Sequence, residues 1–333
     1  MLRREMLGAS CRAVLGAALA ALTGLLSPAA AETYPDRPVT MIVPFAAGGP
    51  SDVLGRLIGQ SMSRTLGQTV IIENVGGAGG TTGAARAARA PADGYTILIH
   101  HVALAAGATL YPNLPYDTLK DFAPIGLVNQ GPFVMISKLD LPPRNIAELL
   151  AYLKANGRSV SLAHAGIGSG AHLCNMLLQS ALQVKVNEIP YRGTGPAMND
   201  LLAGQVDVLC DQTTNSMPQI QGNRVRSYAV TSAERVAQLP DLPTLQQAGL
   251  PGFEITIWHA LYAPKGTPAP ALAKLGAALE AALKDPQVLA RFTDLGTTPY
   301  PEGRRGAAEA RAQLESEVAK WGRVIREAGI VAN

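Results

Sequence analysis

Two adjacent glycines separate an apolar run from a helical pattern near the start of the chain. The apolar run covers residues 39–45, and apolar side chains at helical spacing begin after Pro50. Pro50 suits a first helical turn, and Ser51 and Asp52 favour a helix start. Such a strand–turn–helix leaves backbone N–H groups unpaired, with the positive end of the helix dipole behind them. The stretch therefore predicts an anion-binding turn.

A second glycine turn lies at residues 166–171. Its letters, GIGSGA, match the GxGxxA fingerprint of dinucleotide-binding proteins, and Glu188 follows 17 residues after Ala171. The motif alone is weak, and exported proteins rarely meet nicotinamide cofactors. A dinucleotide site is therefore the less favoured interpretation, and no cofactor is expected. The favoured one is a second turn that binds a carboxylate through backbone N–H groups and the Ser169 hydroxyl.

The sequence lacks the usual patterns for catalysis. It contains neither the phosphate-binding GxxxxGK[ST] motif nor the GxSxG motif of serine hydrolases. Its five histidines are scattered without the close pairs of a metal site, so no metal is expected. These observations favour a binding protein and no catalytic residue. An exported dinucleotide-dependent or hydrolytic enzyme remains the alternative.

The strand–glycine–helix unit recurs along the chain. Alternating strands and helices at this spacing predict a mostly parallel sheet with helices on both faces, whose ligands bind outside the carboxyl ends of the strands. The further predicted strands cover residues 69–75, 95–101, 159–165, 184–191 and 205–211.

Two segments are predicted to cross between domains. They lie around residues 126–136 and 253–264, and helices are expected from residue 270 to 330. If both segments are hinge strands, the domain of residues 32–133 is completed by residues 255–333, and residues 134–254 form an inserted domain. Turns of the two domains that face each other would form one cleft.

The first 31 residues have the composition of a secretory signal peptide. A basic start precedes 14 apolar residues and a cleavage pattern near Ala31, so we expect a periplasmic protein. Export through the general secretory route is preferred over the twin-arginine route.

Removal of residues 1–31 leaves 25 basic and 24 acidic residues, so nucleic acid is not an expected partner. Only Cys174 and Cys210 then remain. They form a disulfide or stay as two buried thiols.

Several phrases of the sequence resemble one known family. They include YPDRPVTMIVPFAAGGPSDVLGRLIGQSM, GQTVIIENVGGAGGTTGAARAARAPADGYTIL, HAGIGSGAHL and PYRGTGPAMNDLLAGQVDVLCD. These look like the Bug or TctC proteins, the extracytoplasmic solute receptors of tripartite tricarboxylate transporters, over residues 34 to about 330. The resemblance implies a fold like type II periplasmic binding proteins, with two doubly wound α/β domains, two hinge strands and a central cleft.

The resemblance also implies a ligand and a mode of binding. The family's ligands are small carboxylates, including di- and tricarboxylates, acidic amino acids and aromatic acids. A monomer that serves a transporter or a sensor is expected. Carried onto this chain, the ligand-binding positions are Phe45, Ala47, Gly48, Gly49, Ser51, Asp52, Gly77, Gly79, Thr81, His101, Ala103, Gly166, Gly168, Ser169, Gly170, His172, Arg192, Gly193, Thr194, Asp211 and Thr213.

One position departs from the family pattern. Family members often carry Ser or Thr after the third strand, whereas this chain has His101-Val102-Ala103. The chain therefore lacks a hydroxyl side chain at this position, and the resemblance does not assign the residues that contact the second end of the ligand. Arg192 is the one formal positive charge that we predict near the ligand.

Overall fold

A computed structural model describes residues 34–329 of the chain. The predicted signal peptide lies outside the described residues. By their contacts, residues 1–36 and residues 37–333 form separate units, and the elements described below belong to the second.

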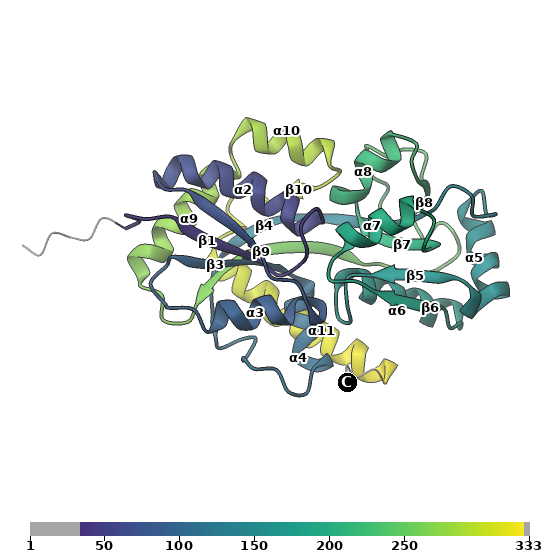
Figure 1. Cartoon of the computed structure of the whole chain (residues 1–333), viewed down its shortest axis with the longest axis horizontal. Helices are drawn as coiled ribbons and strands as arrows, with labels where there is room; N and C mark the ends of the chain where they lie inside the picture. The colour runs from purple at the N-terminus through teal and green to yellow at the C-terminus, as the bar shows by residue number, and fades with distance from the viewer. Residues whose placement is uncertain (1–33, 330–333) are drawn as a thin grey trace, which may run out of the picture. The chain divides into compact units, whose positions relative to one another are not determined.

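The first lobe alternates strands and helices at its start. Figure 1 shows its strands with α2 on one side and α3 on the other. Helix α2 begins at Pro50 directly after its N-cap residue Gly49, as the glycine–proline pattern predicts. The elements in chain order are β1 (Val39–Val43), α2 (Pro50–Leu66), β2 (Val70–Asn74), the 3₁₀ turn η1 (Ala78–Gly80), α3 (Thr81–Ala88), β3 (Thr96–His101) and α4 (Val102–Leu110).

The second lobe repeats this alternation, with helices packed on both faces of its strands. Along β7, Val208 and Cys210 pack into one apolar cluster with Leu173 of α6, whereas Leu209 packs into another with Met198 of α7. This alternation places α6 and α7 on opposite faces. The elements are α5 (Ile146–Asn156), the 3₁₀ turn η2 (Gly157–Ser159), β5 (Ser161–His164), α6 (Gly170–Leu182), β6 (Asn187–Pro190), α7 (Thr194–Leu202), β7 (Val208–Gln212), α8 (Thr213–Gln221) and β8 (Arg226–Val230).

Two long strands join the lobes. Strand β4 (Phe122–Ser137) pairs with β9 (Thr256–Pro264) as far as Pro132, and from Phe133 onward it pairs with β7. The sheet order is β2-β1-β3-β9-β4-β7-β5-β6, and β8 and β10 also pair with β4. The first lobe is completed by α9 (Ala269–Ala282), α10 (Pro286–Asp294), β10 (Thr298–Pro299) and α11 (Ala307–Ala328).

The sheet is mixed, which refines the expectation of a mostly parallel one. Strands β1 to β3 are parallel to one another, and so are β5 to β7, as the alternation predicts. Strands β4 and β9 pair antiparallel with each other and with their lobes. The reason is geometric: the chain leaves the first lobe along β4 and returns along β9, so these neighbours run in opposite directions.

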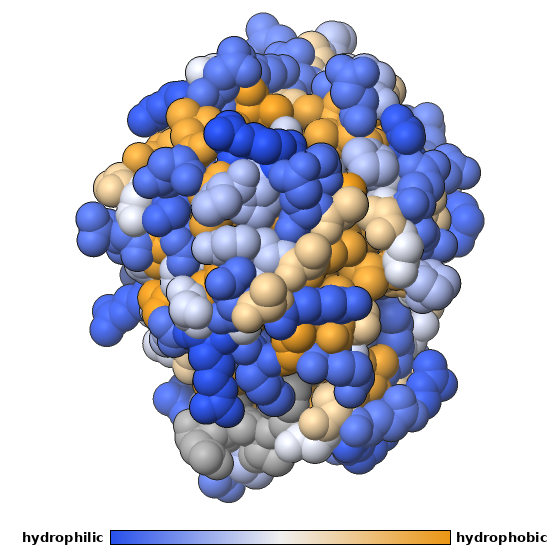
Figure 2. Space-filling model, turned by 90° about the vertical axis from the view of Figure 1, so that its right-hand side faces the viewer, coloured by the Kyte–Doolittle hydropathy of each residue, from blue (hydrophilic) through white to orange (hydrophobic). Residues whose placement is uncertain are grey.

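The predicted C-terminal stripe is part of the core. Leu275, Leu279 and Leu283 are at most 2% exposed, and Leu272 lies at the margin. The face of the molecule seen in Figure 2 carries mostly hydrophilic residues with smaller apolar patches between them. Within residues 34–329, none of the helices combines the length and the apolar character that a membrane crossing requires.

Candidate functional site

A small cavity lies where turns of the two lobes meet. Its volume is about 20 Å³, enough for roughly one water molecule. A larger solute would therefore enter only if the lobes moved apart or side chains shifted. The lining residues come from both lobes and are Phe45, Pro50, Ser51, His101, Phe133, Ala165, Ser169, Gly170, Ala171, Thr194, Asp211 and Gln212.

Five helices begin at this cavity. The lining residues include the first turns of α2, α6 and α7 and the N-cap residues of α4 and α8. Each helix N-terminus presents unpaired N–H groups and the positive end of a dipole. Convergence of five such ends from both lobes favours a negatively charged ligand.

Polar groups without partners line the same cavity. Gln212 is 6% exposed, and its Oε1 has no hydrogen-bond partner among the described residues. The Thr194 hydroxyl is equally buried and makes no hydrogen bond there either, although it lies near enough to Asp211 to lower the pKa of that carboxyl. Buried polar groups normally find partners, so these atoms point to a polar ligand or water.

The formal charge in the lining is negative. No Lys or Arg from the described part of the chain lines the cavity, whereas Asp211 does. Burial raises the pKa of Asp211 to about 6, against hydrogen bonds from Asn215 and from the Gln212 N–H group that lower it. An anion here would rely on backbone dipoles and not on a salt bridge.

The buried Asp52 side chain stabilises the first glycine turn through hydrogen bonds. Its carboxylate accepts hydrogen bonds from the Gly48 N–H group (3.0 Å), from Asn74 Nδ2 (2.9 Å) and from Arg56 Nε (3.0 Å). Burial acts to raise the pKa of Asp52, but these hydrogen bonds together lower it. Asn74 also donates to the Phe45 carbonyl at 3.1 Å. Asp52 therefore fixes the shape of the turn.

His101 lies at the position where the sequence departs from the pattern implied by the resemblance. Its ring stacks on Phe45, with centroids 4.8 Å apart and planes 9° from parallel. Its Nδ1 accepts from the Ala103 N–H group at 3.1 Å, which leaves the ring proton on Nε2. Burial, with help from His259 and His100, holds the pKa of His101 well below its usual value. His101 is thus a neutral donor in the lining.

Every histidine of the protein is buried and has a lowered pKa. Burial lowers the pKa of His100 and His259 to about 3 and that of His164 and His172 to about 4, and His101 shifts the same way. The folded protein therefore keeps these rings neutral at pH 5, whereas the unfolded chain protonates them below about 6.5. Unfolding takes up protons in this window, so stability falls as pH falls. Asp211 has the opposite effect, because its raised pKa lets the folded protein bind a proton as pH falls, but it is one group against five histidines.

Replacing His164 with asparagine is expected to weaken this pH dependence. The Gly166 N–H group donates to His164 Nδ1 at 3.2 Å, and an asparagine oxygen can accept the same bond. When the pH falls from 7 to 5, a buried histidine that stays neutral lowers the free energy of unfolding by about 2 kcal/mol. The variant lacks this histidine, so its free energy of unfolding should not fall by this amount. Urea unfolding at both pH values measures this. Between pH 7 and pH 8 both proteins should behave alike, and an unchanged loss at pH 5 would contradict the prediction.

The two lobes touch at their glycine turns through backbone–backbone and side chain–backbone hydrogen bonds. The Ala46 N–H group donates to the Arg192 carbonyl at 2.9 Å, and the Tyr111 hydroxyl donates to the Ile167 carbonyl at 2.8 Å. A Cβ added at Gly79 would lie 1.9 Å from that Ile167 carbonyl oxygen, and one at Gly195 would lie 2.7 Å from the Ala47 oxygen. Only residues without side chains permit approaches this close.

The predicted site residues fall into three groups. Seven line the cavity: Phe45, Ser51, His101, Ser169, Gly170, Thr194 and Asp211. A second group forms or adjoins the contacting turns: Ala47, Gly48, Gly49, Gly77, Gly79, Gly166, Gly168 and Gly193. The remainder make contacts within the protein or face solvent: Asp52, Thr81, Ala103, His172, Arg192 and Thr213.

Arg192 contributes to the contact through its backbone. Its carbonyl accepts from the Ala46 N–H group, and its side chain is exposed and lines a different depression at the seam of the lobes. Thr81 likewise lines a separate groove and donates to the Ala78 carbonyl at 2.9 Å. A direct ligand contact by either side chain stays a prediction.

Sequence reasoning did not single out several lining residues. Pro50, Ala171 and Gln212 lie inside the predicted turns between predicted site residues, and Ala165 directly precedes the turn that begins at Gly166. Phe133 comes from the crossing strand β4, which carries no local signal for a site. His259 of β9 does not line the cavity, but its Nε2 lies 3.2 Å from Oγ of the lining residue Ser51, and β9 likewise carries no local signal for a site.

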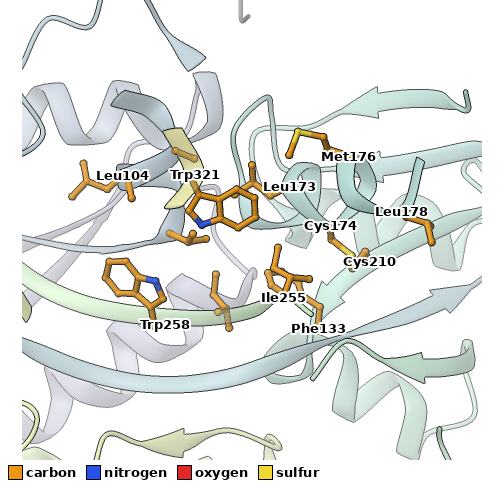
Figure 3. Packing of buried hydrophobic residues seen from close by; sticks show 14 of the residues in the cluster. Leu104, Phe133, Leu173, Cys174, Met176, Leu178, Cys210, Ile255, Trp258 and Trp321 are labelled. Carbon is orange, nitrogen blue, oxygen red and sulfur yellow. A yellow bond between two sulfur atoms is a disulfide. The ribbon is translucent and has the colours of Figure 1, made fainter. Parts of the chain in front are cut away.

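A disulfide joins two elements that carry site residues. Cys174 of α6 is bonded to Cys210 of β7, and both residues are fully buried. Figure 3 shows the bond among apolar side chains near Ile255 and Phe133. The bond therefore ties the start of α6, where Ser169 and Gly170 lie, to the end of β7, where Asp211 lies. It settles the choice between a disulfide and two free thiols.

The chain is similar to known proteins over most of its length. A protein of Agrobacterium vitis, described as "UPF0065 protein in the TAR-I ttuE-ttuC' intergenic region", is 49% identical over 300 residues, which is 90% of this chain and 87% of that protein. The "Structure of periplasmic binding protein BugD" has 48% identity and a TM-score of 0.88, and the match covers 90% of this chain and 100% of that one. MatC of Rhodopseudomonas palustris with bound malate has 40% identity and a TM-score of 0.85, with 88% and 100% covered.

Family membership follows from a match to most of the chain. Residues 54–330 match the family described as "Tripartite tricarboxylate transporter family receptor", also named TctC. The fold of the described residues agrees, since its structural relatives include periplasmic solute-binding proteins. The protein therefore belongs to the TctC family of tripartite tricarboxylate transporter receptors, as the Bug-like phrases of its sequence indicate.

Proposed function

We propose that the protein is an exported solute-binding protein that captures a small carboxylate between its two lobes. The observation that carries this proposal is the convergence of five helix N-termini on one cavity whose lining has no Lys or Arg within residues 34–329. Backbone dipoles stabilise an anion without a formal counter-charge and also permit its release. The malate bound to the relative MatC is a ligand of this chemical class.

The contacts between the lobes support binding by closure. In this proposal residues 32–133 with 255–333 and residues 134–254 act as two domains that swing on β4 and β9. The lobes part to admit the solute, and the contact between Ala46 and Arg192 forms again when they meet. A membrane subunit of a tripartite transporter, or a sensor, would then recognise the closed protein. We propose that the chain acts as a monomer in the periplasm, with a signal peptide cleaved near Ala31.

The geometry argues against the hydrolytic alternative. Ser51 Oγ lies 3.2 Å from His259 Nε2, which is the spacing of a nucleophile and its base. Burial lowers the pKa of His259 to about 3, however, so its ring is a weak base at neutral pH. Its Nδ1 has no orienting partner among the described residues, whereas a catalytic histidine is oriented by a third group. We therefore assign no catalytic role to this pair.

A titration distinguishes this function from its alternatives. Calorimetry with a panel of mono-, di- and tricarboxylates should show at least one ligand that binds one per chain. Nuclear magnetic resonance of the released ligand should show it chemically unchanged, because a receptor does not turn it over. Binding of a neutral sugar with no response to any carboxylate, or conversion of the ligand, would refute the proposal.

A further inference from the structure

A ligand carboxylate alone does not explain why the cavity is also lined by the carboxyl group of Asp211. This carboxyl group is 1% exposed and lines the same cavity as the helix N-termini. A buried carboxylate beside an anion is costly, because like charges repel and burial already disfavours the charged form. Its presence therefore calls for a ligand group that an acceptor can bind.

Hydrogen bonds within the protein hold the Asp211 carboxylate in place without using all of its acceptor sites. Its Oδ1 accepts from the Gln212 N–H group at 2.9 Å, and its Oδ2 accepts from Asn215 Nδ2. An ionised carboxylate has about four acceptor sites, and the Thr194 hydroxyl lies near enough to take a third, so about one remains for a ligand. The neighbouring Gln212 Oε1 is a further acceptor that lacks a partner within the described chain. The end of β7 thus offers fixed acceptors beside the anion site.

We propose that Asp211 selects carboxylates that carry a hydrogen-bond donor, a hydroxyl or an ammonium group, close to the bound carboxylate. The inference rests on the proposed function and specifies the ligand of that same cavity. A donor would hydrogen-bond Asp211, while the carboxylate faces the N-termini of α2, α6 and α7. An unsubstituted dicarboxylate would leave the Asp211 acceptors unpaired, which costs binding free energy.

Three ligands with one carbon skeleton test the selection. Succinate, L-malate and L-aspartate differ only in hydrogen, hydroxyl or ammonium at one carbon. Calorimetry with the unaltered protein at neutral pH should show malate or aspartate binding at least tenfold more tightly than succinate. Equal affinities for the three would overturn the selection by Asp211 and leave carboxylate binding standing. No binding of any carboxylate in the wider panel would refute the proposed function itself.

A pair of variants assigns the selection to Asp211. Asp211→Asn keeps one acceptor oxygen and removes the charge, so the preference for aspartate over succinate should fall at least tenfold and that for malate should fall less. Asp207→Asn is the control, because Asp207 lies just before β7 and binds Ser161 and Lys138 outside the cavity. This control should keep both preferences within threefold. Unchanged preferences in a folded Asp211→Asn protein would overturn the proposal, and the ligand series with the unaltered protein tests it even if that variant does not fold.

Discussion

Replacing Gly195 with valine is expected to weaken carboxylate binding at least 100-fold while the fold persists. Gly195 lies in the first turn of α7, and a Cβ there would lie 2.7 Å from the Ala47 oxygen, 2.8 Å from Gly48 C and 2.9 Å from Gly49 N. All three atoms belong to the backbone of the first lobe, so they cannot rotate away. The clash arises only when the lobes meet, and each tenfold loss of affinity corresponds to about 1.4 kcal/mol.

The control is the same substitution in a helix away from the contact. Gly276 lies within α9, and a Cβ there would meet only the Ile125 oxygen at 3.9 Å, an ordinary contact. Gly276→Val therefore carries the same β-branched side chain in a helix without blocking closure. Calorimetric titration with the best carboxylate, together with thermal melts, compares the two variants. If Gly195→Val binds within threefold of the unaltered protein, contact between these turns is not needed for binding.

Replacing both cysteines with alanine is expected to lower the free energy of unfolding by about 4 kcal/mol. The disulfide closes a loop with a sequence separation of 36 residues, and its loss restores the conformational freedom of the unfolded chain. Urea unfolding of the double variant Cys174→Ala/Cys210→Ala under oxidising conditions measures this loss. Carboxylate affinity should also fall, because the bond holds the start of α6 against the end of β7.

Reductant provides the matched control for the disulfide. The unaltered protein should be unfolded and refolded with an excess of dithiol. Its free energy of unfolding should then fall close to that of the double variant. The double variant should not respond to the dithiol. An unaltered protein whose urea midpoint does not change after complete reduction would contradict the entropic contribution assigned to this bond.

Local sequence patterns predicted the helix starts that define the site. Helix α2 starts at Pro50, as the glycine–proline pattern predicts, because proline suits a first helical turn. The second glycine turn also leads into a helix, but the Ser169 hydroxyl, predicted from the sequence to bind the ligand, accepts from the His172 N–H group and caps α6. The β/α alternation predicted the parallel strands within each lobe for an equally local reason. The family phrases gave the receptor family, which the match over residues 54–330 confirms.

The sequence by itself thus determined the alternation of strands and helices, the glycine turns between them and the family. Only the tertiary structure decided which turn residues line the cavity and which serve contact between the lobes. Gly79 and Gly195 look like other turn glycines in the sequence, yet the backbone of the opposite lobe fills the place of their side chains. Strand β4 brings Phe133 into the lining, and β9 brings His259 against the lining residue Ser51. Such long-range contacts depend on how the lobes pack, and a periodicity of 2 or 3.6 residues carries no information about that packing.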